Sequence, residues 1–147
     1  MSNVQNSKKL HLRIVTPTKS VFEGDVDMVI LHGQDGQLGV MPNHEPVTTI
    51  LGLGAMRVYS NEVITYFAVF GGFAEINQKG VTILADIAEH PDEIDKERAM
   101  SAKERAERRI SERQADLDQA RVKVALRKAL VRLELSGLPT TTETAKK

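Results

Sequence analysis

The chain has 147 residues, no cysteine and a formal net charge of zero, with 20 basic and 20 acidic side chains. The absence of cysteine excludes disulfides and thiolate metal sites, and the balanced charge gives no overall attraction to nucleic acid or to an anionic membrane. No apolar run approaches the roughly 20 residues that span a bilayer, so we predict no direct membrane insertion. The first nine residues are polar and lack a signal-peptide core, so we expect a protein in, or facing, the cytoplasm.

The composition changes near residue 90. Nine of the ten glycines and all six phenylalanine and tyrosine residues precede it, and these residue types favour turns and strands over helix interiors. The first part also has an excess of acidic side chains and the second an excess of basic ones. We therefore predict three regions: a strand domain over 1–90, a helical domain over 91–137 and a disordered polar tail over 138–147.

Short alternating or apolar segments, separated by turn residues, occupy the first region. The expected strands are 10–16, 26–32, 55–59, 63–70, 73–77 and 81–88, with hairpin turns at 60–62 and 78–80. No helix-length segment lies between them, which disfavours a βαβ arrangement. The pattern favours an antiparallel sandwich or barrel.

The second region predicts two helices. Asp92 can cap a first helix that runs to about Gln114, with a thin apolar stripe made largely of alanine (Ala99, Ala102, Ala106, Ile110). A turn and a new cap at 116–118 lead to a second helix from about Gln119 to Ser136, which Gly137 and Pro139 end. The short turn predicts an antiparallel hairpin.

The second helix has a wider apolar side than the first: Val122, Val124, Leu126, Ala129, Leu130 and Leu133. An alanine stripe cannot cover all of this surface. The strand domain, a partner protein or both must cover the remainder. The helix is also basic, but no aromatic residue lies among its charges, which disfavours nucleic-acid binding.

Motifs for catalysis and metal binding are missing from the sequence. The glycine-rich segment 33–39 lacks the lysine of a P-loop and does not open a helix. There is no GxSxG nucleophile motif, and the four histidines are neither clustered nor spaced as metal ligands. We predict no catalytic residues and no metal site. Segment 33–39 is either a partner-docking loop or a tight connection between strands.

One group of charged residues extends over the predicted hairpin. Asp95, Arg98 and Ala99 share a face of the first helix and Arg105 continues it, while Lys128 and Arg132 share a face of the second. Folding the hairpin brings these faces and Glu89 together. Carboxylates can accept hydrogen bonds from an adenine amino group or ribose hydroxyls, and arginine and lysine can hold phosphates. A solvated, salt-bridged helix face explains the same spacing, so both interpretations stay open.

Several segments, in order, resemble the epsilon subunits of bacterial F-type ATP synthases. The resemblance covers residues 10–135 and is carried by 21–24, 36–44, 71–75, 81–86, 94–99 and 102–109. It implies an α+β fold, with an antiparallel β-sandwich of about ten short strands followed by a two-helix antiparallel hairpin. It also implies a non-catalytic rotor subunit of a proton- or sodium-translocating ATP synthase, peripheral on the cytoplasmic face of the bacterial cell membrane.

The resemblance further implies the partners. The segment containing Gly36, Leu38, Met41 and His44 is expected to face the gamma subunit and the c-ring. The hairpin is expected to extend towards the alpha and beta subunits and to inhibit ATP hydrolysis. No cofactor is required, but ATP is expected as a regulatory ligand that favours the folded hairpin.

The implied nucleotide-binding residues are Glu89, Asp95, Arg98, Ala99, Arg105, Lys128 and Arg132. Lys128 stands where the family typically has an arginine, and lysine cannot make the bidentate phosphate contact of arginine. Two other functions remain open at this point. One is a free-standing cytosolic nucleotide-sensing module. The other is an unrelated sandwich module that oligomerises through the apolar side of its second helix.

Overall fold

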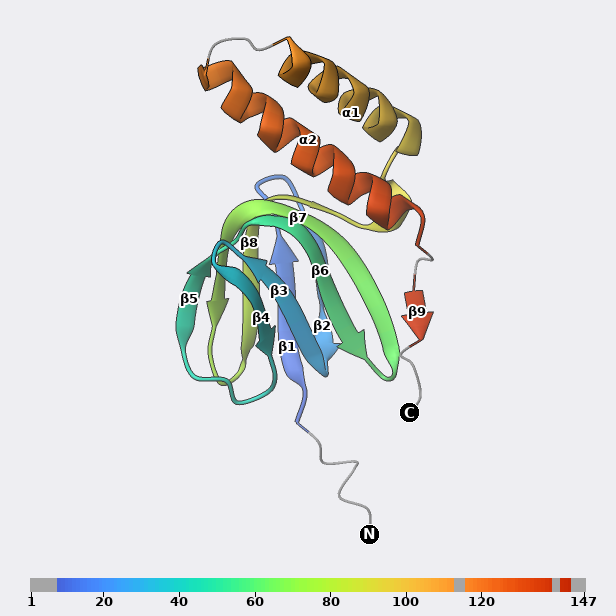
Figure 1. Ribbon diagram of the computed structural model, residues 1–147. Helices are drawn as coiled ribbons and strands as arrows, with labels where there is room; N and C mark the ends of the chain where they lie inside the picture. Colours follow the sequence, from blue (N-terminus) through green and yellow to red (C-terminus); the bar gives the residue numbers. More distant parts are fainter. Residues whose placement is uncertain (1–7, 113–115, 139–140, 144–147) are drawn as a thin grey trace.

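The computed structural model describes residues 8–112, 116–138 and 141–143 (Figure 1). Eight strands come first: β1 (Leu10–Val15), β2 (Ser20–Val26), β3 (Met28–Gly33), β4 (Gly36–Val40), β5 (Val47–Ile50), β6 (Leu53–Ser60), β7 (Val63–Ile76) and β8 (Gly80–Glu89). A short 3-10 helix, η2 (Pro91–Glu93), leads to α1 (Lys96–Ser111) and α2 (Asp116–Ser136), and a ninth strand, β9 (Thr141–Glu143), follows. This order confirms the predicted α+β fold, with eight strands rather than ten in the described part of the first domain.

The strands form one sheet that folds into a sandwich, in the order β2-β1-β8-β7-β6-β3-β4, with β5 and β9 also paired to β7. All pairs are antiparallel except β1 with β8. Strand β7 is the longest and belongs to both layers. One of its edges pairs with β6 and then β5, and the other pairs with β9 and then β8.

The two glycines in the middle of β7 allow it to bend between the layers. Gly71 and Gly72 have positive φ angles of 76° and 105°, and a Cβ atom on Gly72 would lie 2.0 Å from the carbonyl oxygen of Leu84. Only glycine fits such a conformation and such a close approach. The sequence predicts two strands here, 63–70 and 73–77, and that prediction is wrong because the bend does not interrupt the pairing with β8.

The other strand predictions differ in outcome. Strand β1 and the β6–β7 hairpin are confirmed, and Asn61 and Glu62 supply the two positive φ angles that a tight hairpin turn needs. The predicted strand 26–32 is broken at Asp27, whose carboxylate accepts a hydrogen bond from the backbone of Asn61. Strands β2, β4 and β5 are not predicted by the sequence because they are largely exposed edge strands without regular alternation.

Two apolar clusters divide the interior. The larger lies inside the sandwich and contains eighteen buried residues, including Phe67 and Val69 of β7. The alternate residues Ala68 and Phe70 face outward and form a second cluster with Val131 and Leu135 of α2. Side chains along a strand alternate between faces, so this apolar run is buried on both sides. The strand domain thus covers part of the surplus apolar surface of α2.

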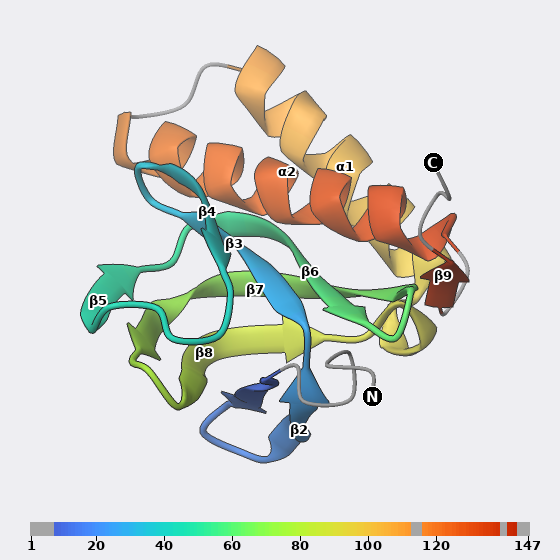
Figure 2. The same ribbon diagram turned by 90° about the horizontal axis from the view of Figure 1, so that it is seen from below.

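Helix α2 lies between the strands and α1 (Figures 1 and 2). The predicted alanine stripe of α1 is buried at Ala99 and Ala106. The predicted apolar side of α2 is only partly right. Val122 and Ala129 are buried, but Val124 and Leu130 are 43% and 40% exposed, and the buried Val131 and Leu135 are missing from the prediction.

The helix ends also differ from the sequence prediction. Asp95, not Asp92, caps α1, because its Oδ1 accepts a hydrogen bond from the backbone N–H of Arg98 (3.1 Å). Asp92 lies in η2, which His90 caps. The expected turn at 116–118 is part of α2, and the expected end of the first helix near Gln114 lies outside the described residues.

The predicted disordered tail is corrected at residues 141–143. These form β9, which pairs with residues 63–65 of β7, at an edge that β8 leaves open after Glu89 pairs with Ala68. Residues 139–140 and 144–147 lie outside the described residues. Within the described parts of the chain, no helix has the length and apolar character needed to cross a membrane.

Candidate functional site

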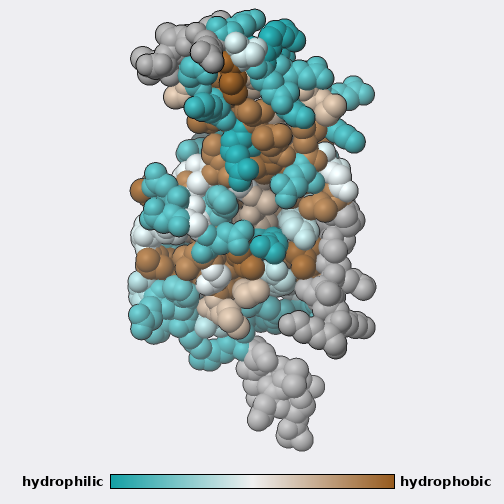
Figure 3. Space-filling model, in the orientation of Figure 1, coloured by the Kyte–Doolittle hydropathy of each residue, from teal (hydrophilic) through white to brown (hydrophobic). Residues whose placement is uncertain are grey.

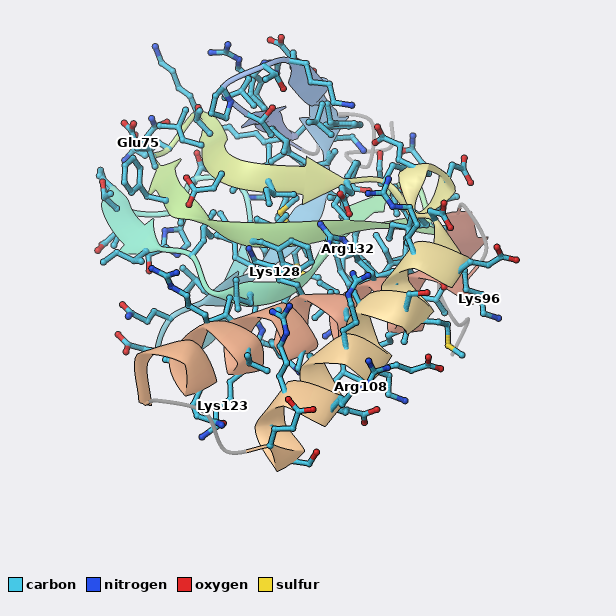
Figure 4. The ribbon with its side chains drawn as sticks, turned by 90° about the horizontal axis from the view of Figure 1, so that it is seen from above. Glu75, Lys96, Arg108, Lys123, Lys128 and Arg132 are labelled. Carbon is cyan, nitrogen blue, oxygen red and sulfur yellow. The ribbon has the colours of Figure 1, made fainter. Side chains whose placement is uncertain are left out.

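A cavity of about 680 Å³ lies at the junction of the two domains, where β8 ends and α1 begins. Its wall combines acidic, basic and small residues: Glu89, Glu93, Ile94, Asp95, Glu97, Arg98, Ala99, Ser101, Ala102, Arg105 and Arg132. Six of the seven residues expected to bind nucleotide therefore line one cavity. The seventh, Lys128, is one helical turn before Arg132 and does not line it. Both side chains lie where α2 faces the strands (Figure 4).

Arg132 makes the strongest contacts in the cavity. Its Nε and Nη2 donate hydrogen bonds to Oε1 and Oε2 of Glu89, at 2.8 and 3.2 Å. The two side chains are only 27% and 28% exposed, and the guanidinium lies 4.9 Å from the ring centroid of Phe70. A two-pronged, half-buried ion pair is stronger and better defined than an exposed one. It fixes α2 against the end of β8.

Lys128 shares the aromatic ring with Arg132. Its Nζ lies 5.9 Å from the Phe70 centroid, which is near the outer limit for a cation–π contact. Lys128 and Arg132 therefore flank one side of α2, next to the second apolar cluster. Two cations so close to each other make this side of α2 locally positive.

The start of α1 supplies the opposite wall. Asp95 uses one carboxylate oxygen to cap the helix. Ala99 is buried, and its small side chain leaves space in the cavity. Arg98 and Arg105 are exposed on the same helix. Across the described residues, neither guanidinium forms an ion pair within 4.0 Å. The guanidinium N–H groups of Arg98 and Arg105 are therefore available to bind a ligand.

Glu93 is a cavity residue that the sequence analysis does not identify. One of its oxygens accepts a hydrogen bond from Lys19 (2.7 Å) and the other from the backbone N–H of His90 (3.0 Å). The Lys19 ammonium, and then the His90 N–H, lower the pKa of Glu93 below its ordinary value. The signal in the sequence is a capping box, in which His90 replaces the usual serine or threonine.

The cavity can accept a polar, anionic ligand. Glu89 and Asp95 can accept hydrogen bonds from amino or hydroxyl groups, and the three arginines can bind phosphate oxygens. The volume falls within the range of about 300–1,000 Å³ that ligand pockets occupy. No three histidine or acidic side chains in the described residues converge on a metal site.

The four residues expected to face partners lie on β4 and in the segment after it. Gln37, between two of them, lines a second cavity together with Arg127 and Val131 of α2. Gly36 begins β4 with a φ angle of 130°, and Leu38 pairs with Leu31 and packs partly on the core. Met41 is 60% exposed, and His44 Nδ1 lies 2.7 Å from the carbonyl oxygen of Glu45. Segment 33–39 contains a hairpin between β3 and β4, which confirms a tight strand connection; docking of the same segment on a partner stays a prediction.

Two exposed apolar side chains are neighbours on β5 and β7. We call Ile50 and Phe73 the apolar end surface; they are 57% and 49% exposed and directly opposite each other across β5 and β7. Met41 and Val47 are also exposed, but Val47 is opposite the buried Ile76 and so lies on the other face of β5. Figure 3 shows apolar side chains over the strand domain as well as over the helices. Adjacent exposed apolar side chains such as Ile50 and Phe73 are found at interaction surfaces.

Comparisons with known proteins identify both domains. Residues 9–91 match the family model of the ATP synthase delta/epsilon chain β-sandwich domain, and residues 92–137 match that of the delta/epsilon chain long α-helix domain. The ATP synthase epsilon chain of Halalkalibacterium halodurans is 46% identical over 129 residues, which is 87% of this chain and 97% of that one. The epsilon chain of Desulforamulus reducens is 42% identical over 128 residues, again 87% and 97%.

Solved structures share the fold. A chain of the Euglena gracilis mitochondrial ATP synthase (OSCP/F1/c-ring) matches with a TM-score of 0.76 and 23% identity, over 88% of this chain and 82% of that one. A chain of the Tetrahymena thermophila mitochondrial enzyme (central stalk/c-ring) matches with a TM-score of 0.64 and 12% identity, over 88% and 98%. From its two matched domains and its similarity to bacterial epsilon chains, this chain belongs to the ATP synthase delta/epsilon chain family, as a non-catalytic subunit of the epsilon type.

Proposed function

We propose that this subunit couples rotation to ATP synthesis in a proton- or sodium-translocating ATP synthase and restrains ATP hydrolysis through its helical hairpin. The observation that carries the proposal is the unequal size of the two apolar clusters. Eighteen buried residues hold the sandwich together, whereas four join α2 to the strands. Elements with few buried contacts open at a lower free-energy cost than the core. The hairpin can therefore separate from a sandwich that stays folded.

The apolar end surface is the proposed seat on the gamma subunit and the c-ring. Its two side chains lie outside both clusters, and the contact would remove them from water at about 25 cal/mol per Å². Such a seat would hold the subunit at the cytoplasmic face of the bacterial cell membrane without entering the bilayer. The alpha and beta subunits are the proposed partners of the extended hairpin.

ATP is the proposed ligand of the cavity. Both walls of the cavity are complete only when α1 lies on α2 and α2 lies on the strands, because its cations come from both helices and Glu89 comes from β8. A ligand that binds only the folded hairpin shifts the equilibrium towards that state. ATP would thus act as a regulatory ligand that favours the non-inhibitory form.

Titration of the isolated protein with ATP tests the nucleotide site. We expect chemical-shift changes at Asp95 and Arg105 and a higher melting temperature, both lost in Arg105→Ala. Arg109→Ala is the matched control, because Arg109 is exposed on the same helix and does not line the cavity. Absence of any change at millimolar ATP, or equal loss in both variants, would rule out this site.

Reconstitution tests the regulatory role. ATP synthase assembled with residues 1–91 in place of the complete chain should keep its coupling and hydrolyse ATP faster, because the inhibitory hairpin is missing. Equal hydrolysis rates with the two forms would contradict inhibition. Co-purification separates a rotor subunit from a free-standing nucleotide sensor. A rotor subunit should recover the gamma subunit with the complete chain and lose it in Ile50→Asp and in Phe73→Asp.

A further inference from the structure

The hairpin leaves and rejoins the sheet at the same edge of β7. Glu89, the last residue of β8, is opposite Ala68, and Thr141, the first residue of β9, is opposite Thr65. Strand β6 occupies the other edge of β7 throughout this region. The strands that flank the hairpin therefore pair with residues of β7 that are only three positions apart. Strand β9 lies along the same edge of β7 as β8, just beyond the point where β8 ends (Figures 1 and 2).

This edge of β7 needs a partner. Where β8 ends, the backbone groups of residues 63–65 would face outward without a strand beside them, and open strand edges tend to pair with another chain. Strand β9 supplies that pairing with backbone atoms, in register from Val63 with Glu143 to Thr65 with Thr141. The pairing depends on the strand conformation of 141–143 and not on apolar packing, which is why a polar segment can perform it.

The pairing is compatible only with a folded hairpin. Residues 137–140 connect α2 to β9 and span at most roughly 18 Å, even when fully extended. Helix α2 has 21 residues and is about 31 Å long. If the C-terminal end of α2, where Val131 and Leu135 pack in the second cluster, left the strands by more than this span, it would be out of reach of residues 63–65. Extension of the hairpin must therefore be preceded by release of β9.

We propose that β9 is a latch that holds the hairpin in its folded position without any ligand. The α-helix domain model of the family ends at residue 137, so β9 lies beyond the matched part and adds a restraint to it. The inference rests on the mobile hairpin of the proposed function. It makes release of the C-terminal strand a step that must occur before the hairpin reaches another subunit.

Hydrogen exchange of the isolated, nucleotide-free protein tests the latch. Adjacent N–H groups along a strand point to opposite sides, so the double variant Thr141→Pro/Thr142→Pro removes one that faces β7. The control is Thr141→Ala/Thr142→Ala, which keeps the backbone donors. We expect the amides of α2 to exchange about tenfold faster in the proline variant, as for the loss of one or two backbone hydrogen bonds. Equal exchange of α2 in the two variants would overturn the proposal.

A disulfide provides the opposite perturbation, and the chain contains no other cysteine. Ile64 and Thr142 are directly opposite each other, so Ile64→Cys/Thr142→Cys should oxidise in the folded protein and slow the exchange of α2. The control pair, Ser60→Cys/Thr142→Cys, should not oxidise because Ser60 lies on β6, at the other edge of β7. Failure of the first pair to oxidise, or oxidation without slower exchange, would overturn the latch.

Neither readout uses ATP or hydrolysis, so the latch and the proposed function fail separately. If the latch holds but ATP does not bind and hydrolysis is unaffected by the hairpin, the proposed function is wrong and the latch remains. If ATP binds and inhibition is observed while both latch tests fail, the proposed function remains and β9 has no restraining role.

Discussion

The guanidinium of Arg132 and the carboxylate of Glu89 form a two-pronged ion pair, with hydrogen bonds of 2.8 and 3.2 Å, that joins α2 to the last residue of β8. Both residues are expected nucleotide ligands, yet in the ligand-free protein each is the other's partner. A phosphate group that binds Arg132 must therefore compete with Glu89. In the ligand-free protein, the Glu89 carboxylate occupies the phosphate-binding donors of Arg132, and the same ion pair stabilises the folded hairpin.

Removal of the charge on Glu89 should loosen the hairpin. In Glu89→Gln, the half-buried guanidinium of Arg132 loses its charged partner, and we expect docking of α2 to weaken by about 1–2 kcal/mol. Faster hydrogen exchange of α2 amides would measure the change. Glu104→Gln is the control, because Glu104 is exposed on α1 and does not line the cavity. If both variants exchange like the native protein, the ion pair does not hold the hairpin.

Two phenylalanines on β7 separate packing from partner contact. Phe70 is 1% exposed and lies under α2, whereas Phe73 is 49% exposed in the apolar end surface. We expect Phe70→Ala to lower the free energy of unfolding by about 3–5 kcal/mol, as for other buried aromatic deletions, and to free α2 first. Phe73→Ala should change stability by less than about 1 kcal/mol and weaken binding to the gamma subunit. Urea denaturation measures the change in stability, and co-purification measures binding to the gamma subunit. A larger loss of stability in Phe73→Ala than in Phe70→Ala would contradict this packing.

His11 gives the strand domain a pH dependence. Its ring nitrogens lie 2.8 Å from Asp25 and 3.0 Å from Glu23 on β2, and these hydrogen bonds, Asp25 first, raise the pKa of His11 above its ordinary value of 6.5. Because the folded pKa is higher than the unfolded one, the contribution of this group to stability is fully present below pH 6.5 and is lost as the pH rises through the folded pKa. An NMR titration should find His11 titrating above 6.5, and Asp25→Asn should lower that pKa, whereas Asp35→Asn, in the β3–β4 turn, should not.

The sequence predicts the architecture and six of the eleven residues that line the cavity, because these depend on strong local patterns. The glycine and aromatic distribution identifies the strand domain, and helical spacing brings Asp95, Arg98 and Arg105 to one face. The errors occur where tertiary contacts decide. Asp95 replaces Asp92 as the cap because η2 takes up the first acidic residue, and β9 forms only because an open edge of β7 lies within reach.

Helix α2 shows most clearly why one sequence pattern is not enough. A single apolar stripe is expected of a helix with one buried face, but α2 lies between α1 and the strands and is buried on two sides. Val122 and Val131 are nine residues apart, which places them on opposite sides of the helix, and both are buried. Val124 is on nearly the same side as Val131 but two turns earlier, beyond the contact with the second cluster, and so remains exposed.

Lys128 sets the expected strength of nucleotide binding. It lies one turn before Arg132 and its Nζ is 5.9 Å from the Phe70 ring, but it does not line the cavity. The arginine side chain reaches further than that of lysine, and it can bind a phosphate through two parallel N–H donors. We therefore expect Lys128→Arg to tighten ATP binding about tenfold, equivalent to about 1.4 kcal/mol, with calorimetry as the measurement. Lys123→Arg is the control, since Lys123 is exposed and its side chain points away from the strands (Figure 4). Equal affinities for Lys128→Arg and the native chain would mean that the phosphates are held by Arg98, Arg105 and Arg132 alone.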